Sequence, residues 1–219
     1  MLEDAAGRAE LQRLGARSIP VLSRGDKFTF AQNIAQVVEF LKLDEKTGPV
    51  LSPAQLVERM QIFIDAALRI VPLMPDDRLN REVPNRPRSY RTVAHHMFRI
   101  PEAFVEVTGG AFFSAELPTA VARPGEMAST AALAAYGRGV REQVRAWWQA
   151  TADKSCQETV QTYYGPQKLH EVLERSTWHI AQHDRQWMML LDMAGIAFER
   201  PLGDQDFADL PMPKQVWDD

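Results

Sequence analysis

The amino-acid sequence predicts a mainly α-helical protein, an antiparallel four-helix bundle preceded by a small α/β segment. Apolar residues recur at helical spacing in four long stretches beyond residue 50, with irregular connections between them. Runs rich in β-forming residues are confined to the beginning of the chain. We therefore divide the chain into a small segment, residues 1–45, and a bundle with a C-terminal tail, residues 50–219.

The amino-acid composition indicates a globular protein and argues against some classes of binding partner. The chain has 219 residues, 45% of them hydrophobic, which is enough to bury a core. Its net charge of -4 argues against nucleic acid or an anionic membrane as a partner. No apolar run reaches the roughly 18 residues of a membrane-spanning helix. With no signal-peptide pattern at its start and a single cysteine, Cys156, the chain is expected to be cytoplasmic and free of internal disulfides.

The first segment alternates helix and strand patterns. Residues 3–15 form an amphipathic pattern, and residues 18–22 and 27–30 are two short strands around the turn at Arg24-Gly25-Asp26. A further helix is predicted over residues 32–43, followed by a polar linker at residues 46–49. A two-stranded hairpin leaves its edges open, so we expect this segment to dock on the bundle or to pair with a second copy in a homodimer.

The order of these elements, with Ser18-Ile19-Pro20-Val21, resembles the C-terminal half of a glutaredoxin or thioredoxin-like domain. In that family the proline of this stretch is cis and faces the active-site cysteines. The half that would carry Cys-X-X-Cys is absent here. We therefore expect a structural appendage without thiol-disulfide activity.

The first two bundle helices have clear boundaries. Ser52-Pro53-Ala54-Gln55 combines an N-cap, a proline in the first turn and a capping-box glutamine, and the helix is expected to reach Val71. After a proline-rich loop at residues 75–87, a second helix begins near Ser89 and ends at Gly109-Gly110.

The apolar spacing of this second helix turns His96 inward. His95 falls on the face that carries Arg91 and Arg99, and it is expected to be solvated. Pro101 removes a backbone donor, so we expect a kink or break just beyond His96.

The second half of the chain completes the bundle. Residues 111–127, with Phe112, Phe113, Pro118 and Pro124, form a long connection that could wall a cleft. A third helix follows it, and residues 154–162 are expected to be a polar loop. The fourth helix is predicted from about Pro166 to Ala194.

Two histidines four residues apart, His179 and His183, share the inward face of this last helix. Buried imidazoles need partners, and a metal ion with open coordination positions would serve both. Correct helix pairing would add His96 as a third ligand. The alternative is that these histidines are only hydrogen-bonded within the core, because a core histidine is more often hydrogen-bonded than metal-bound.

Arg91-Thr92-Val93-Ala94-His95-His96, followed by Thr177-Trp178-His179-Ile180-Ala181-Gln182-His183, resembles the DinB-like superfamily over roughly residues 52–196. Members are four-helix bundles whose metal site takes one histidine from the second helix and a His-X-X-X-His pair from the last. The resemblance implies His96, His179 and His183 as ligands, with His95 in place of His96 if the register of the second helix slips.

Two functions remain open at this point. The superfamily includes thiol-dependent S-transferases and a mycothiol-dependent maleylpyruvate isomerase. The resemblance therefore implies that this chain binds a divalent metal ion, and zinc and nickel are the ions we expect. The metal would activate glutathione or another low-molecular-weight thiol for attack on an electrophile. The alternative is a non-catalytic stress-related or interaction module with a structural histidine cluster. The sequence indicates no residues that would bind the thiol or take part in catalysis.

Three other groups are weaker candidates. His170 lies roughly opposite His179 on the helix and is expected at the surface. Cys156 has no basic neighbourhood that would lower its pKa. Glu174 and Arg175 are expected to form a solvated pair.

Overall fold

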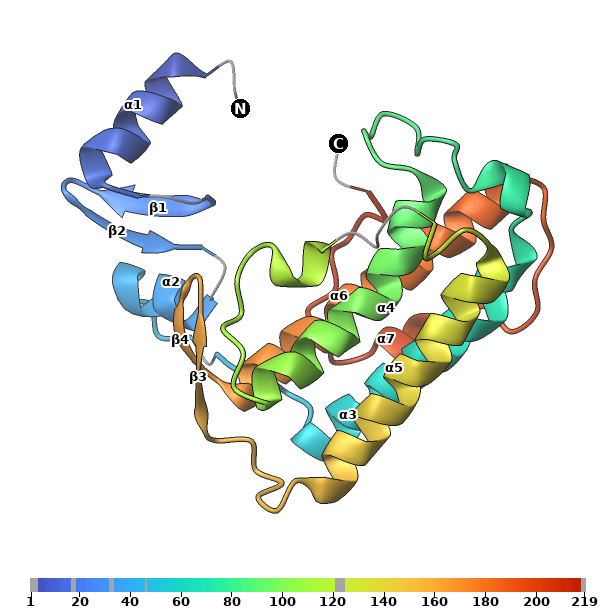
Figure 1. The fold of residues 1–219 in the computed structure, drawn as a ribbon. Helices are drawn as coiled ribbons and strands as arrows, with labels where there is room; N and C mark the ends of the chain where they lie inside the picture. Colours follow the sequence, from blue (N-terminus) through green and yellow to red (C-terminus); the bar gives the residue numbers. More distant parts are fainter. Residues whose placement is uncertain (1–3, 17–18, 32–33, 46, 121–124, 218–219) are drawn as a thin grey trace. The chain divides into compact units, whose positions relative to one another are not determined.

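The structure is a computed structural model that describes residues 4–16, 19–31, 34–45, 47–120 and 125–217 (Figure 1). The chain separates into two compact units, residues 1–48 and 49–219. Within the described residues, no helix is both long and apolar enough to span a bilayer.

The first unit has the predicted order of elements. Helix α1 (Ala5–Leu14) is followed by strands β1 (Val21–Arg24) and β2 (Lys27–Phe30) and by helix α2 (Ile34–Leu41). The strands pair antiparallel around Gly25, whose positive φ of 61° suits the tight turn.

Short-range features explain these elements. The Asp4 carboxylate accepts from the Gly7 amide at 2.9 Å and caps α1. The Ile19–Pro20 bond is cis.

Some predictions for this unit are not tested. The residues predicted at the element boundaries, Glu3, Ser18, Gln32 and Lys46, lie outside the described part of the chain. The thioredoxin-like resemblance of this unit stays a prediction.

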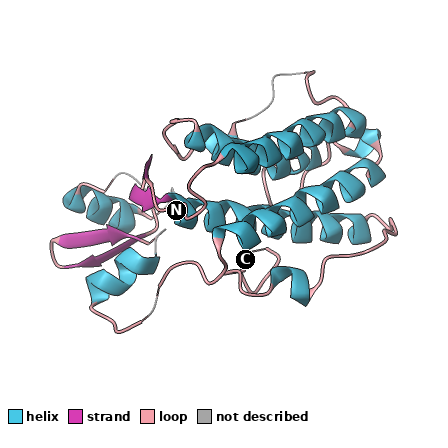
Figure 2. Ribbon diagram, turned by 90° about the horizontal axis from the view of Figure 1, so that it is seen from below, coloured by secondary structure: helices cyan, strands magenta, loops and turns pink. Residues whose placement is uncertain are grey.

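The second unit is a four-helix bundle, as the sequence predicts (Figures 1 and 2). Helix α6 packs against α3 and α4, and α5 packs against the same two helices. The four long helices are α3 (Pro53–Ile70), α4 (Tyr90–Thr108), α5 (Thr130–Ala150) and α6 (Leu169–Met193). The short helices of the connections and tail are η1 (Val71–Leu73), η2 (Asp76–Arg78), η3 (Leu117–Thr119) and α7 (Asp204–Phe207).

Caps and core packing hold the bundle. Ser52 and Gln55 form the predicted capping box of α3, and Ser89 accepts from the Thr92 amide at the start of α4. Trp187 of α6 is fully buried, and its indole Nε1 donates to the Ile70 carbonyl at 3.1 Å. This bond ties the last long helix to the end of the first.

Residues 159–168 differ from the prediction. They form a hairpin of strands β3 (Thr159–Thr162) and β4 (Gly165–Lys168), so α6 begins at Leu169 and not near Pro166. The physical reason lies in the turn: Gly165 adopts a φ of 107°, a conformation that a helix cannot include. The polar loop predicted over residues 154–162 therefore ends in a strand.

Of the predicted kink or break in α4, the break is absent. The helix is continuous from Tyr90 to Thr108 with Pro101 inside it. Pro101 is buried, and α4 packs against both α5 and α6. Tertiary packing on two sides keeps the helix intact despite the backbone donor that proline lacks.

Candidate metal centre

The packing of α4 against α6 brings three histidines together. His96 comes from α4, and His179 and His183 lie one turn apart on α6. The ring centroid of His96 lies 5.2 Å from that of His179 and 4.6 Å from that of His183, and the α6 pair is 5.0 Å apart. One possible ligand atom from each ring lies within 4.8 Å of the other two. These are the three residues that the sequence indicated as a cluster.

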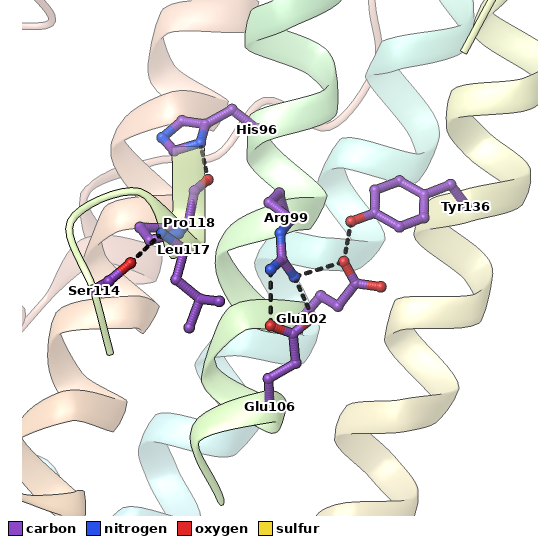
Figure 3. Close-up of polar contacts among 8 residues, drawn as sticks. All are labelled: His96, Arg99, Glu102, Glu106, Ser114, Leu117, Pro118 and Tyr136. Carbon is purple, nitrogen blue, oxygen red and sulfur yellow. Dashed lines mark hydrogen bonds and ion pairs between the residues drawn. The ribbon is translucent and has the colours of Figure 1, made fainter. Parts of the chain in front are cut away.

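A backbone carbonyl orients His96. Its Nδ1 lies 2.6 Å from the Pro118 carbonyl oxygen in η3 (Figure 3). A carbonyl can only accept, so Nδ1 carries the proton and Nε2 keeps the lone pair that a metal requires. Pro118 is held in turn because the Leu117 amide donates to Ser114 Oγ at 3.1 Å.

A short part of the long connection therefore contacts this site. The sequence predicted that residues 111–127 would form a wall, and η3 within that segment contacts His96. Phe113 is buried, whereas Phe112 is 54% exposed. Pro124 lies outside the described residues.

A glutamine orients His183 in a similar way. His183 is buried, and its Nδ1 lies 2.7 Å from Gln186 Oε1. Gln186 Nε2 donates to the Val216 carbonyl at 3.0 Å, which identifies Oε1 as the acceptor from the histidine. His183 Nε2 is then the nitrogen available to a metal. The sequence contained a hint of this contact, because residues i and i+3 share a helix face.

The three imidazoles are neutral at physiological pH. Burial lowers the pKa of His96 to about 4 and that of His183 to about 3. Burial and the neighbouring His183 also place the pKa of His179 well below its usual value. Neutral imidazole is the form that binds a metal ion. Three neutral rings, of which His96 and His183 keep an unprotonated Nε2, form a donor set that fits a divalent cation.

His95 does not lie where the sequence placed it. It is buried rather than solvated, and its ring stacks on Tyr136 with centroids 5.2 Å apart. Arg99, predicted on the same polar face, is also buried, and its guanidinium binds Glu102 at 2.8 Å and Glu106 at 2.7 Å (Figure 3). Helix α5 covers this face of α4, which is possible because the charges are paired.

The structure also shows the surroundings of the three weaker candidate groups from the sequence. His170 is half-buried, with Nε2 2.8 Å from the Leu51 carbonyl oxygen. Cys156 is buried, and burial raises its pKa to about 11, so its thiol is unreactive. Arg175, predicted to pair with Glu174 in solvent, lies over the ring of Tyr164.

A cavity of about 210 Å³ opens beside the cluster. Its lining residues are Arg88, Thr92, His95, His96, Thr119 and Ala120. Because His96 belongs to both the cluster and the cavity wall, a small molecule in the cavity would lie next to one of the three clustered histidines. Arg88 follows the proline-rich loop and belongs to no motif, so the sequence gives no signal for it.

The Gln186 contact yields a first prediction. The variant Gln186→Leu should weaken binding of Zn²⁺ by roughly 10- to 100-fold, because His183 loses the acceptor that fixes its tautomer and ring orientation. The affinity would be measured by competition with a chromophoric chelator.

Gln182→Leu is the matched control. Gln182 Nε2 also donates to the Val216 carbonyl, at 2.6 Å, but Gln182 has no hydrogen bond to a histidine. Its loss should leave zinc affinity within about twofold. Equal weakening in both variants would show that attachment of the tail, and not the Gln186–His183 bond, sets the affinity.

A comparison with solved structures supports the fold. A crystal structure of a DinB-like protein from Bacillus cereus ATCC 10987 superposes with a TM-score of 0.53 at 19% sequence identity. The match covers 68% of this chain and 94% of that protein. No family model and no curated protein matches the sequence. The chain therefore has the fold of a DinB-like protein, in agreement with the resemblance found in its sequence.

Proposed function

We propose that this chain is a metal-dependent enzyme of thiol chemistry, an S-transferase or isomerase that uses a small-molecule thiol and an electrophile. The supporting observation is the ligand set. Three histidines converge, and among the described residues no carboxylate or cysteine joins the group. A purely structural metal site is usually closed by four protein ligands, whereas a catalytic site keeps a position for water or substrate.

The protein's own residues would hold and orient the ion. His96 and His183 would bind through Nε2, since both Nδ1 atoms are already hydrogen-bonded. His179 would complete the set from one turn before His183. Burial also keeps the rings unprotonated.

A bound divalent ion would supply a Lewis acid that lowers the pKa of a thiol at its open position. Three neutral ligands leave the full positive charge of the ion in place, which favours an anionic partner. The cavity beside His96 provides the space in which a thiol and an electrophile could meet. Zinc and nickel are both compatible with imidazole ligands.

Cobalt substitution tests this proposal on the full chain. Addition of glutathione or 3-mercapto-1-propanol to the cobalt-loaded protein should produce a sulfur-to-metal charge-transfer band. Removal of the metal should abolish conjugation of 1-chloro-2,4-dinitrobenzene to the thiol above the rate without protein. The matched control is the cobalt-loaded His170→Ala variant, whose histidine lies outside the cluster and should not affect either result.

A different outcome would favour the structural module. If the cobalt spectrum does not respond to any thiol and metal removal lowers only the melting temperature, the metal is a staple of the bundle. That pair of results would contradict the enzyme proposal.

A further inference from the structure

The cavity beside His96 has an unusual chemical balance. Its wall contains one guanidinium, two imidazoles and two hydroxyl groups, from Arg88, His95, His96, Thr92 and Thr119. No carboxylate lines it among the described residues. The protein as a whole is acidic, with a net charge of -4, so the cavity departs from the average surface.

Arg88 is the charged residue that lines this cavity, and its guanidinium could bind an anionic ligand. Its side chain is exposed, and the ion pairs found within the described residues do not include it. The nearby arginines of α4 are already engaged. Arg99 pairs with two glutamates, and Arg91 donates to Asn80 and to the Met127 carbonyl.

Arg88 also lies close to the histidine cluster. Arg88 and His96, which is one of the three clustered histidines, line the same cavity. An ion in the cluster would add two more positive charges next to the same cavity. A guanidinium on the wall of a small polar cavity and a divalent ion next to the same cavity favour a ligand that carries negative charge.

We propose that Arg88 binds the carboxylate of a small-molecule ligand in this cavity, while the reacting part of that ligand or of its co-substrate lies at the histidine cluster. Guanidinium and carboxylate match in shape and can form two parallel hydrogen bonds. The proposal rests on the proposed function and specifies it: at least one of the two substrates is a carboxylic acid. That acid is either the thiol or the electrophile.

The test compares two thiols of the same chain length, one with a charged and one with a neutral end group. 3-Mercaptopropionate carries a carboxylate, and 3-mercapto-1-propanol carries a hydroxyl group at the same position. Each is titrated into the cobalt-loaded full chain, and the dissociation constant is read from the charge-transfer band. If the thiol supplies the carboxylate, the acid should bind about tenfold more tightly or better, and Arg88→Gln should remove that preference without changing the affinity for the alcohol.

A second titration covers the electrophile. Propionate is added to the cobalt-loaded chain already saturated with 3-mercapto-1-propanol, and binding is followed by calorimetry. If the electrophile supplies the carboxylate, propionate should bind to this complex, and Arg88→Gln should weaken it about tenfold. The thiol pair should then show no charge preference.

Arg81→Gln is the matched control. Arg81 is an exposed arginine of the same connecting segment, it does not line the cavity, and the substitution removes the same charge. Cobalt content and circular dichroism should be unchanged in both variants, which shows that the fold and the metal are retained. An equal effect of both substitutions would attribute the preference to net charge and would overturn the proposal.

The proposal and the function on which it rests can fail separately. If no thiol changes the cobalt spectrum, the thiol function is contradicted, and propionate is then titrated into the zinc-loaded chain without thiol. Binding that weakens in Arg88→Gln but not in Arg81→Gln would retain the carboxylate site. Binding of propionate and of 3-mercaptopropionate that does not depend on Arg88 would overturn it.

Discussion

Replacement of His179 or His183 by alanine is expected to abolish the binding of about one divalent metal ion per chain. Both rings belong to a cluster of three, and the loss of either leaves two imidazole ligands. With roughly 3 kcal/mol per ligand, as the total for structural zinc sites suggests, the affinity should fall by about a hundredfold or more. Elemental analysis of the purified variants and chelator competition would measure this.

His170→Ala serves as the control for these variants. It lies on the same helix, is half-buried and contacts a backbone carbonyl, but it lies outside the cluster. Its metal content should equal that of the wild type. Undiminished metal in the His179→Ala, His183→Ala double variant would eliminate the assignment of this site.

Gly137→Ala is expected to destabilise the bundle, because the new methyl group has no room. Gly137 of α5 faces Phe98 of α4, and an added Cβ would lie 2.4 Å from a carbon of that ring. Phe98 is fully buried and cannot swing into solvent. Overpacking of this kind costs about 1–3 kcal/mol in the free energy of unfolding, which urea denaturation would measure.

Gly139→Ala, two residues later in the same helix, is the matched control. No atom lies within 4 Å of its added Cβ, and the position is exposed. Alanine gains roughly 0.5–1 kcal/mol over glycine in a helix, and this gain is common to both variants. The difference between them therefore isolates the steric cost at Phe98. Equal stabilities would mean that α4 and α5 are not as closely packed as the structure shows.

The long helices were predictable because their determinants are local. Ser52 and Gln55 close the capping box of α3, and Ser89 caps α4, as their spacing indicates. The apolar spacing of α6 likewise places His183 inside. Such features depend on residues three or four positions apart, so they can be inferred without knowledge of the partner helices.

The predictions were wrong where contacts between distant segments override the local sequence pattern. His95 and Arg99 lie on a polar stripe that suggests solvent, but α5 covers the stripe and the side chains find partners there. The start of α6 was misplaced because the pairing of Thr162 with Gly165 competes with helix formation. Neither the cover nor the pairing can be derived from helical periodicity.

The sequence by itself determined the bundle and the identity of the three clustered histidines, because helix periodicity places residues 179 and 183 on one face and His96 on an inward face. Only the tertiary structure decided how the imidazole rings of that cluster are oriented and which cavity lies beside them. The Pro118 carbonyl beside His96, the Gln186 amide beside His183 and the Arg88 side of the cavity belong to segments outside those helix faces or to polar residues without a motif. The Pro118 and Arg88 contacts arise from the docking of loops on the helices, and the Val216 carbonyl of the tail sets the orientation of the Gln186 amide. These are non-local steps with no repeating pattern in the chain.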